Sequence, residues 1–104
     1  MSKINVNELD IQHDTGNGRI YFEQKDAENA ALQYELDTTS GSTVINFTST
    51  FVPEAVQEMG IGTRLVEEGM RLADKEGYKV KASCPFVKNY MNEEREFAHL
   101  YQQL

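Results

Sequence analysis

The residues that decide the fold are 57–66, which read Gln-Glu-Met-Gly-Ile-Gly-Thr-Arg-Leu-Val. A segment rich in β-branched and aromatic residues, 43–52, precedes this stretch, and an amphipathic segment follows it. A strand that leads into a helix through glycines leaves bare backbone N–H groups at a helix N-terminus, which carries about +0.5 of a charge. The pattern therefore predicts either an anion site for a phosphate-bearing cofactor or a plain glycine turn.

Two other phosphate-binding motifs do not fit this stretch. A nucleotide P-loop requires a lysine directly after its second glycine, whereas Thr63 follows Gly62 here. A dinucleotide-binding motif requires three spaced glycines near a first strand. Here the glycine pair lies past the middle of the chain and the third glycine is missing.

Length and composition limit the class of protein. The 104 residues predict a single domain over 1–104, and 39% hydrophobic content is that of a globular chain. We expect no transmembrane span and no signal peptide, because no long apolar run occurs. One cysteine, Cys84, excludes an internal disulfide and favours the cytoplasm. The net charge of −7 argues against a nucleic-acid partner and is compatible with a cationic acceptor such as an amine, although acidic surfaces also keep small proteins soluble. No metal site is expected.

The order of elements follows from the change in hydrophobic periodicity. Alternation predicts strands over 9–13, 19–24, 30–36, 43–52 and 78–84. A period near 3.6 predicts a helix from Gly62 to a left-handed C-cap at Gly77, with an ion pair between Glu67 and Arg71. A short helix with a frayed tail is expected within 86–104. This order predicts an α+β fold with a mostly antiparallel sheet, in which the helix from Gly62 is a β-α-β crossover between parallel strands.

At this point a family resemblance becomes visible. Gln57-x-x-Gly60-x-Gly62 between a strand and an amphipathic helix resembles the pyrophosphate-binding segment of the GNAT superfamily of acyl-CoA-dependent N-acyltransferases. The sequence is also similar to a very small branch of that superfamily, the yjdJ type, in Thr50-x-Val52-Pro53 and in Cys84-Pro85-Phe86-Val87 followed by Tyr90. The resemblance covers residues 43–90, about half of the chain.

The resemblance implies a GNAT-like fold that binds acetyl-CoA. Strands 43–52 and 78–84 would splay apart at their C-terminal ends, and the pantetheine arm would fit between them. The diphosphate would rest on backbone N–H groups from Gln57 to Arg64, and Thr63 could add a hydroxyl. Arg64 could instead pair with Glu67 or Glu68. The cofactor-binding residues implied are Phe51, Val52, Gln57, Glu58, Met59, Gly60, Ile61, Gly62, Thr63 and Arg64.

The same resemblance implies acetyl transfer from the thioester to an amine. Cys84 lies at the strand end that faces the expected thioester, either as a nucleophile or as a small packing residue. Tyr90 falls near the position from which the superfamily often supplies a tyrosine to protonate the thiolate leaving group, or it packs within a helix. His13 is a candidate base only because histidine is rare in this chain, and His99 lies in the expected tail.

Two departures from the family pattern bear on activity. Relatives usually carry histidine where this chain has Ser49, and glycine where it has Glu58 beside the pyrophosphate loop. The chain also lacks the helical pair that builds the acceptor pocket in larger members, which suggests an open site for a small-molecule amine or a protein lysine. The sequence therefore predicts an acetyl-CoA-dependent N-acetyltransferase, with two alternatives: a non-catalytic CoA-binding or regulatory module of the same fold, and an interaction domain whose glycines are structural.

Overall fold

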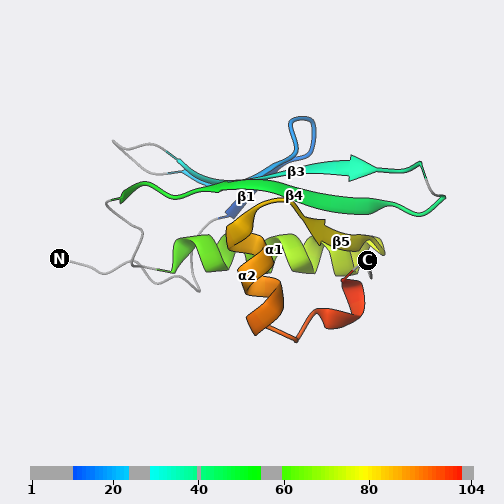
Figure 1. The fold of residues 1–104 in the computed structure, drawn as a ribbon. Helices are drawn as coiled ribbons and strands as arrows, with labels where there is room; N and C mark the ends of the chain where they lie inside the picture. Colours follow the sequence, from blue (N-terminus) through cyan, green and yellow to red (C-terminus); the bar gives the residue numbers. More distant parts are fainter. Residues whose placement is uncertain (1–10, 24–28, 40, 55–59, 102–104) are drawn as a thin grey trace.

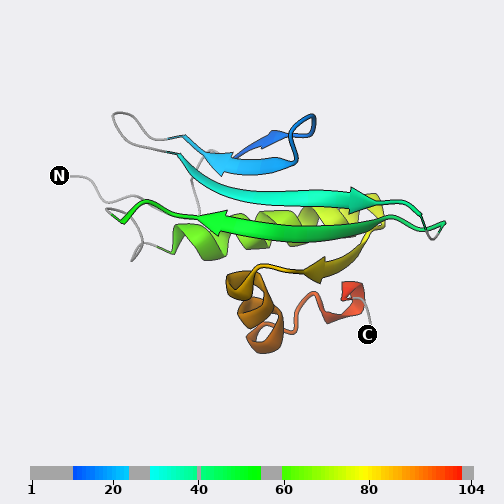
Figure 2. The ribbon, with the colours of Figure 1, turned by 45° about the horizontal axis from the view of Figure 1, so that its top comes forward.

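One mixed sheet organises the residues that the computed structural model describes, which are 11–23, 29–39, 41–54 and 60–101 (Figures 1 and 2). Its five strands lie side by side in chain order, and only the pair β4 and β5 is parallel. This arrangement confirms the predicted mostly antiparallel sheet. The strands are β1 (Ile11–Asp14), β2 (Arg19–Phe22), β3 (Ala30–Asp37), β4 (Val44–Phe51) and β5 (Lys79–Ala82).

The helix α1 (Ile61–Glu76) is the crossover that joins parallel strands β4 and β5. It runs along one face of the sheet (Figure 1). Gly60 and Gly77 flank it in the left-handed conformation, with φ of 76° and 75°, so the predicted C-cap at Gly77 is confirmed. The second helix, α2 (Pro85–Glu93), follows β5, and Pro85 opens it at a position where proline needs no hydrogen-bond donor. A short 3-10 helix, η3 (Ala98–Leu100), comes next.

The hydrophobic core lies between α1 and the sheet. Gly69 allows α1 to approach the sheet closely, because a Cβ atom there would lie 2.8 Å from the ring of Phe47. The core side chains from the sheet and from α1 include Ile20, Leu32, Ile45, Phe47, Val80, Leu65, Val66, Met70 and Ala73.

No helix of the described residues covers the opposite face of the sheet (Figure 1). The side chains there are mostly polar, as in the cross-strand row of Glu35, Asn46 and Lys81. A period of two that buries one face and solvates the other is typical of antiparallel sheets. We refer to this surface as the uncovered face.

A β-bulge interrupts β4, and the sequence did not predict it. Gln33 pairs with Ser49 but Tyr34 pairs with Phe47, so Thr48 is an extra residue on β4. One extra residue reverses the alternation of side chains beyond it. As a result Thr50, the partner of buried Leu32, faces the α1 side, whereas Ser49 faces the uncovered face.

Candidate functional site

The parallel strands β4 and β5 part at one end of the sheet. Their last pair is Phe47 with Ala82, and the N–H groups of Ser83 and Cys84 both donate to the Phe47 carbonyl, at 3.0 and 3.1 Å. Beyond this point β4 continues along β3 to Phe51, while the chain after β5 turns into α2. The expected strand 78–84 is therefore shorter than predicted, because its last two residues converge on one carbonyl.

A cavity of about 360 Å³ opens where the two strands part. Three elements enclose it: the end of β4, the start of α1 and the start of α2. The lining residues are Thr50, Val52, Gly60, Gly62, Thr63 and Phe86. Four of the ten residues that the resemblance implied for cofactor binding thus line one cavity, namely Val52, Gly60, Gly62 and Thr63.

The N-terminus of α1 opens on this cavity, and no side chain of the described residues caps it. The first helical hydrogen bond runs from the Arg64 N–H to the Gly60 carbonyl at 3.0 Å, and no acidic residue stands in the first turn. The N–H groups of residues 61–63 precede this bond, so the helix itself gives them no acceptor. Backbone donors and the positive end of the helix dipole therefore face the same space.

The two glycines of the motif serve different purposes. Gly60 is required by its backbone, because its φ of 76° disfavours other residues and no atom lies within 4 Å of a Cβ placed there. Gly62 is required by packing, because a Cβ would lie 3.1 Å from Phe86 Cζ and 3.2 Å from Val52 Cγ2. Because Gly62 has no side chain, Val52, which follows β4, and Phe86, which belongs to α2, can pack directly against the start of α1.

Other predicted cofactor residues lie elsewhere or outside the described residues. Phe51 pairs with Ala31 on the uncovered face and is 49% exposed. The Ile61 side chain belongs to the core and is fully buried, so only its backbone is available at the helix start. Gln57, Glu58 and Met59 fall outside the described residues.

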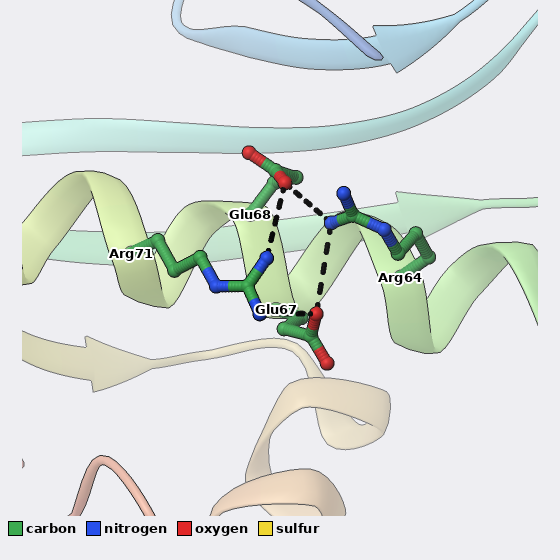
Figure 3. Close-up of polar contacts among 4 residues, drawn as sticks. All are labelled: Arg64, Glu67, Glu68 and Arg71. Atoms are coloured by element: carbon green, nitrogen blue, oxygen red, sulfur yellow. Dashed lines mark ion pairs between the residues drawn. The ribbon is translucent and has the colours of Figure 1, made fainter. Parts of the chain in front are cut away.

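Arg64 takes part in a charge network along α1 (Figure 3). Its Nη1 lies 2.5 Å from Glu68 Oε1 and 3.7 Å from Glu67 Oε1. Arg71 contacts the same two glutamates, at 3.0 Å from Glu67 and 3.5 Å from Glu68. These contacts confirm the predicted pair between Glu67 and Arg71 and the expected alternative for Arg64. Because Nη1 makes no hydrogen bond of good geometry, the attraction to the glutamates is ionic.

Cys84 is buried beside the cavity, at the N-cap of α2. Its Sγ lies 3.4 Å from Oγ1 of Thr50, which lines the cavity. Burial raises the pKa of the Cys84 thiol, but the Thr50 hydroxyl and the backbone N–H groups of Val87, Phe86 and Thr50 outweigh it, so the pKa is lowered overall. The thiolate, the reactive form of cysteine, is therefore more accessible at Cys84 than in an ordinary cysteine.

Tyr90 lines a second cavity, of about 210 Å³, which adjoins the first through Thr63 and Phe86. The other residues around it are Asn89, Glu93 and Glu94. Burial, followed by the nearby charge of Glu67, raises the pKa of Tyr90 to about 12. The phenol therefore keeps its proton at neutral pH.

Neither histidine lines the cavity between the strands. His13 on β1 hydrogen-bonds to Tyr34, and His99 on η3 lies 3.4 Å from Asp74. Ser49, at the position where relatives carry histidine, donates to Gln33 Oε1 at 3.0 Å on the uncovered face. Thr50 was not among the site residues expected from the sequence, although it belongs to the Thr50-x-Val52-Pro53 motif.

Within the described residues, no group of histidine, cysteine, aspartate and glutamate side chains is arranged to hold a metal ion. The described helices also include none that is long and apolar enough to cross a membrane.

Comparison with known proteins identifies the family. The model of the GCN5-related N-acetyl-transferases matches residues 19–100, well over half of the chain. The chain belongs to the GCN5-related N-acetyltransferase family. Among solved structures, this family member is similar to the NMR solution structure of a GCN5-like protein from Staphylococcus aureus, itself a candidate N-acetyltransferase. The two are 23% identical, with a TM-score of 0.72 over 92% of this chain and 90% of the other. No curated protein matches the sequence significantly.

Proposed function

We propose that this member of the family is an acetyl-CoA-dependent N-acetyltransferase that transfers an acetyl group to an amine. One observation carries the proposal: the cavity where β4 and β5 part is continuous with the N-terminus of α1, which no described side chain caps. A thioester with a long arm and a diphosphate needs both features, a slot between strands and a cluster of backbone donors.

The residues present fit acetyl-CoA in a defined way. The N–H groups of residues 61–63 and the Thr63 hydroxyl would hold the diphosphate, and Gly60 leaves the approach open. The edge of β4 near Phe51 would pair with the pantetheine arm, and the Val52 side chain would form a wall. Contacts from Gln57, Glu58, Met59 and Arg64 remain part of the proposal; Arg64 would have to share its charge between the diphosphate and its two glutamates.

Acetyl-CoA supplies an activated acetyl group, and the protein would hold the reacting groups in position. Cys84 has two roles open to it. Its lowered pKa supports a nucleophile, and its burial supports a packing residue next to the acetyl group. Tyr90 keeps its proton and would serve as the acid for the departing thiolate, as the resemblance implies.

The acceptor site would be open, because no helix stands between the described strands β1 and β2. A flexible small-molecule amine or a protein lysine would then have access. The net charge of −7 would attract a cationic acceptor. We propose the cytoplasm as the location, because the chain has one cysteine and no internal disulfide.

A second candidate function is a non-catalytic CoA-binding or regulatory module. The absence of histidine among the residues lining the cavity favours it, since no imidazole there could deprotonate the amine. Ser49 faces the uncovered face and does not replace such a base.

Isothermal titration with acetyl-CoA tests both candidates, because both require binding. No heat above background at millimolar ligand would leave only a structural role for the glycines. Release of free thiol from acetyl-CoA in the presence of a panel of amines would then separate the enzyme from the binding module. Cys84→Ala decides between the two roles of Cys84: loss of turnover with retained binding indicates a nucleophile, and unchanged turnover indicates packing.

A further inference from the structure

Thr50 is the residue that connects the cavity to the buried thiol. It lines the cavity between the strands, and its hydroxyl lies 3.4 Å from Cys84 Sγ. It reaches that position because the bulge at Thr48 reverses the alternation along β4. If β4 ran through Thr48 without a bulge, strict alternation would place Ser49 on the α1 side and Thr50 on the uncovered face.

We propose that Thr50 is a positioning residue, whose hydroxyl donates a hydrogen bond to Cys84 Sγ and holds that sulfur in a fixed orientation beside the cavity. This inference rests on the proposed function, in which Cys84 faces the acetyl group. Thr50 itself exchanges no proton with the thiol: the Cys84 proton leaves to solvent, and Thr50 keeps its own.

The ionisation state of Cys84 decides which of the two groups donates the hydrogen bond. While Cys84 is neutral, either the thiol or the Thr50 hydroxyl can be the donor. Once the sulfur is ionised it can only accept, and the bond becomes charge-assisted. The hydroxyl of Thr50 therefore stabilises the thiolate more than the thiol.

Backbone N–H groups around the sulfur act in the same direction as the Thr50 hydroxyl. The backbone N–H groups of Phe86 and Val87, in the first turn of α2, and that of Thr50 also favour the charged sulfur. The largest contributions that lower the pKa of Cys84 thus come from hydrogen-bond donors. Of these donors only the Thr50 hydroxyl can be removed by a side-chain substitution.

Thr50→Val tests the proposal, because valine keeps the branched shape and removes the hydroxyl. The chain has a single cysteine, so labelling with ¹³C-cysteine gives one Cβ signal whose pH dependence reports thiolate formation. We expect the midpoint to rise by about one pH unit, which corresponds to a tenfold smaller thiolate fraction below the midpoint. Alkylation by iodoacetamide, in which the thiolate displaces iodide, should slow about tenfold in the same range.

Two further variants separate positioning from packing. Thr50→Ser keeps the hydroxyl and should retain the wild-type midpoint. Thr39→Val makes the same change in the turn after β3, where the hydroxyl donates to Asp37 Oδ1 at 2.7 Å, and should also leave the midpoint unchanged. If Thr50→Val fails to show a cooperative melting transition, the comparison of Thr50→Ser with Thr50→Ala replaces it.

A midpoint in Thr50→Val that coincides with that of the wild type would overturn the proposal, as would an equal rise in Thr50→Ser. Neither readout involves acetyl-CoA. A protein that binds no acetyl-CoA but shows the shifted midpoint would therefore refute the proposed function and leave the contact between Thr50 and Cys84 established.

Discussion

Substitutions at Gly60 and Gly77 allow the effect of backbone strain to be measured separately from the effect on cofactor binding. They flank α1 with nearly equal torsions, φ 76° and ψ 16° at Gly60 and φ 75° and ψ 26° at Gly77. At both positions a Cβ would meet no atom within 4 Å. Only Gly60 lines the cavity between the strands. The same substitution at the two sites should therefore cost the same stability and differ in its effect on acetyl-CoA.

The cost to stability follows from the left-handed backbone alone. Alanine in this conformation costs about 1–2 kcal/mol, and each kcal/mol lowers the melting temperature of a domain of this size by about 4–8 °C. We expect Gly60→Ala and Gly77→Ala to melt at similarly reduced temperatures in differential scanning calorimetry. A large difference between the two would mean that Gly60 has contacts other than those described.

Binding should distinguish the pair. Asparagine tolerates the left-handed region better than other residues, so Gly60→Asn and Gly77→Asn add bulk with less strain. Isothermal titration with acetyl-CoA should show at least about a tenfold weaker affinity for Gly60→Asn, a loss of about 1.4 kcal/mol, and wild-type affinity for Gly77→Asn. Equal affinities in the two variants would refute the placement of the diphosphate at the start of α1.

Three further predictions concern other parts of the structure. Gly62→Ala should displace the ring of Phe86 toward the cavity, since its Cβ would lie 3.1 Å from Cζ, and weaken acetyl-CoA binding in titration with little change in melting temperature. Gly69→Ala should destabilise the fold in urea, because a Cβ 2.8 Å from the buried Phe47 ring costs about 1–3 kcal/mol against a helix gain of about 1 kcal/mol; a stabilised variant would contradict the packing. Burial and Glu67 raise the pKa of Tyr90 to about 12, above the ordinary value of about 10 in the unfolded chain. The unfolded chain therefore loses this proton first as the pH rises. The contribution of the neutral phenol to the free energy of unfolding is complete below pH 10 and is lost as the pH rises to 12. Tyr90→Phe should remove that part of the alkaline loss in urea titrations, and an unchanged pH profile would show that Tyr90 is not its source.

The elements of this protein could be predicted because each leaves a local pattern in the sequence. Alternating residues placed β3 and β4, a period near 3.6 placed α1, and Gly77 placed its end. The parallel pairing of β4 with β5 also followed, because a strand, a helix and a strand in succession can rejoin one sheet only by a crossover. The glycine motif likewise singled out Gly60, Gly62 and Thr63, which line one cavity.

The assembly of that site depended on contacts between residues distant in sequence. The bulge at Thr48 is set by the register between β3 and β4, and this register determines that Thr50 rather than Ser49 faces Cys84. The parting of β4 from β5 arises because two N–H groups converge on the Phe47 carbonyl.

The sequence by itself determined which residues are strand, helix and turn, since torsional preference and burial pattern are properties of neighbouring residues. Only the tertiary structure decided which face each side chain of β4 occupies beyond the bulge, and therefore which hydroxyl meets the thiol. A one-residue bulge puts every later side chain on the face opposite to the one that strict alternation predicts, and no local preference encodes that shift.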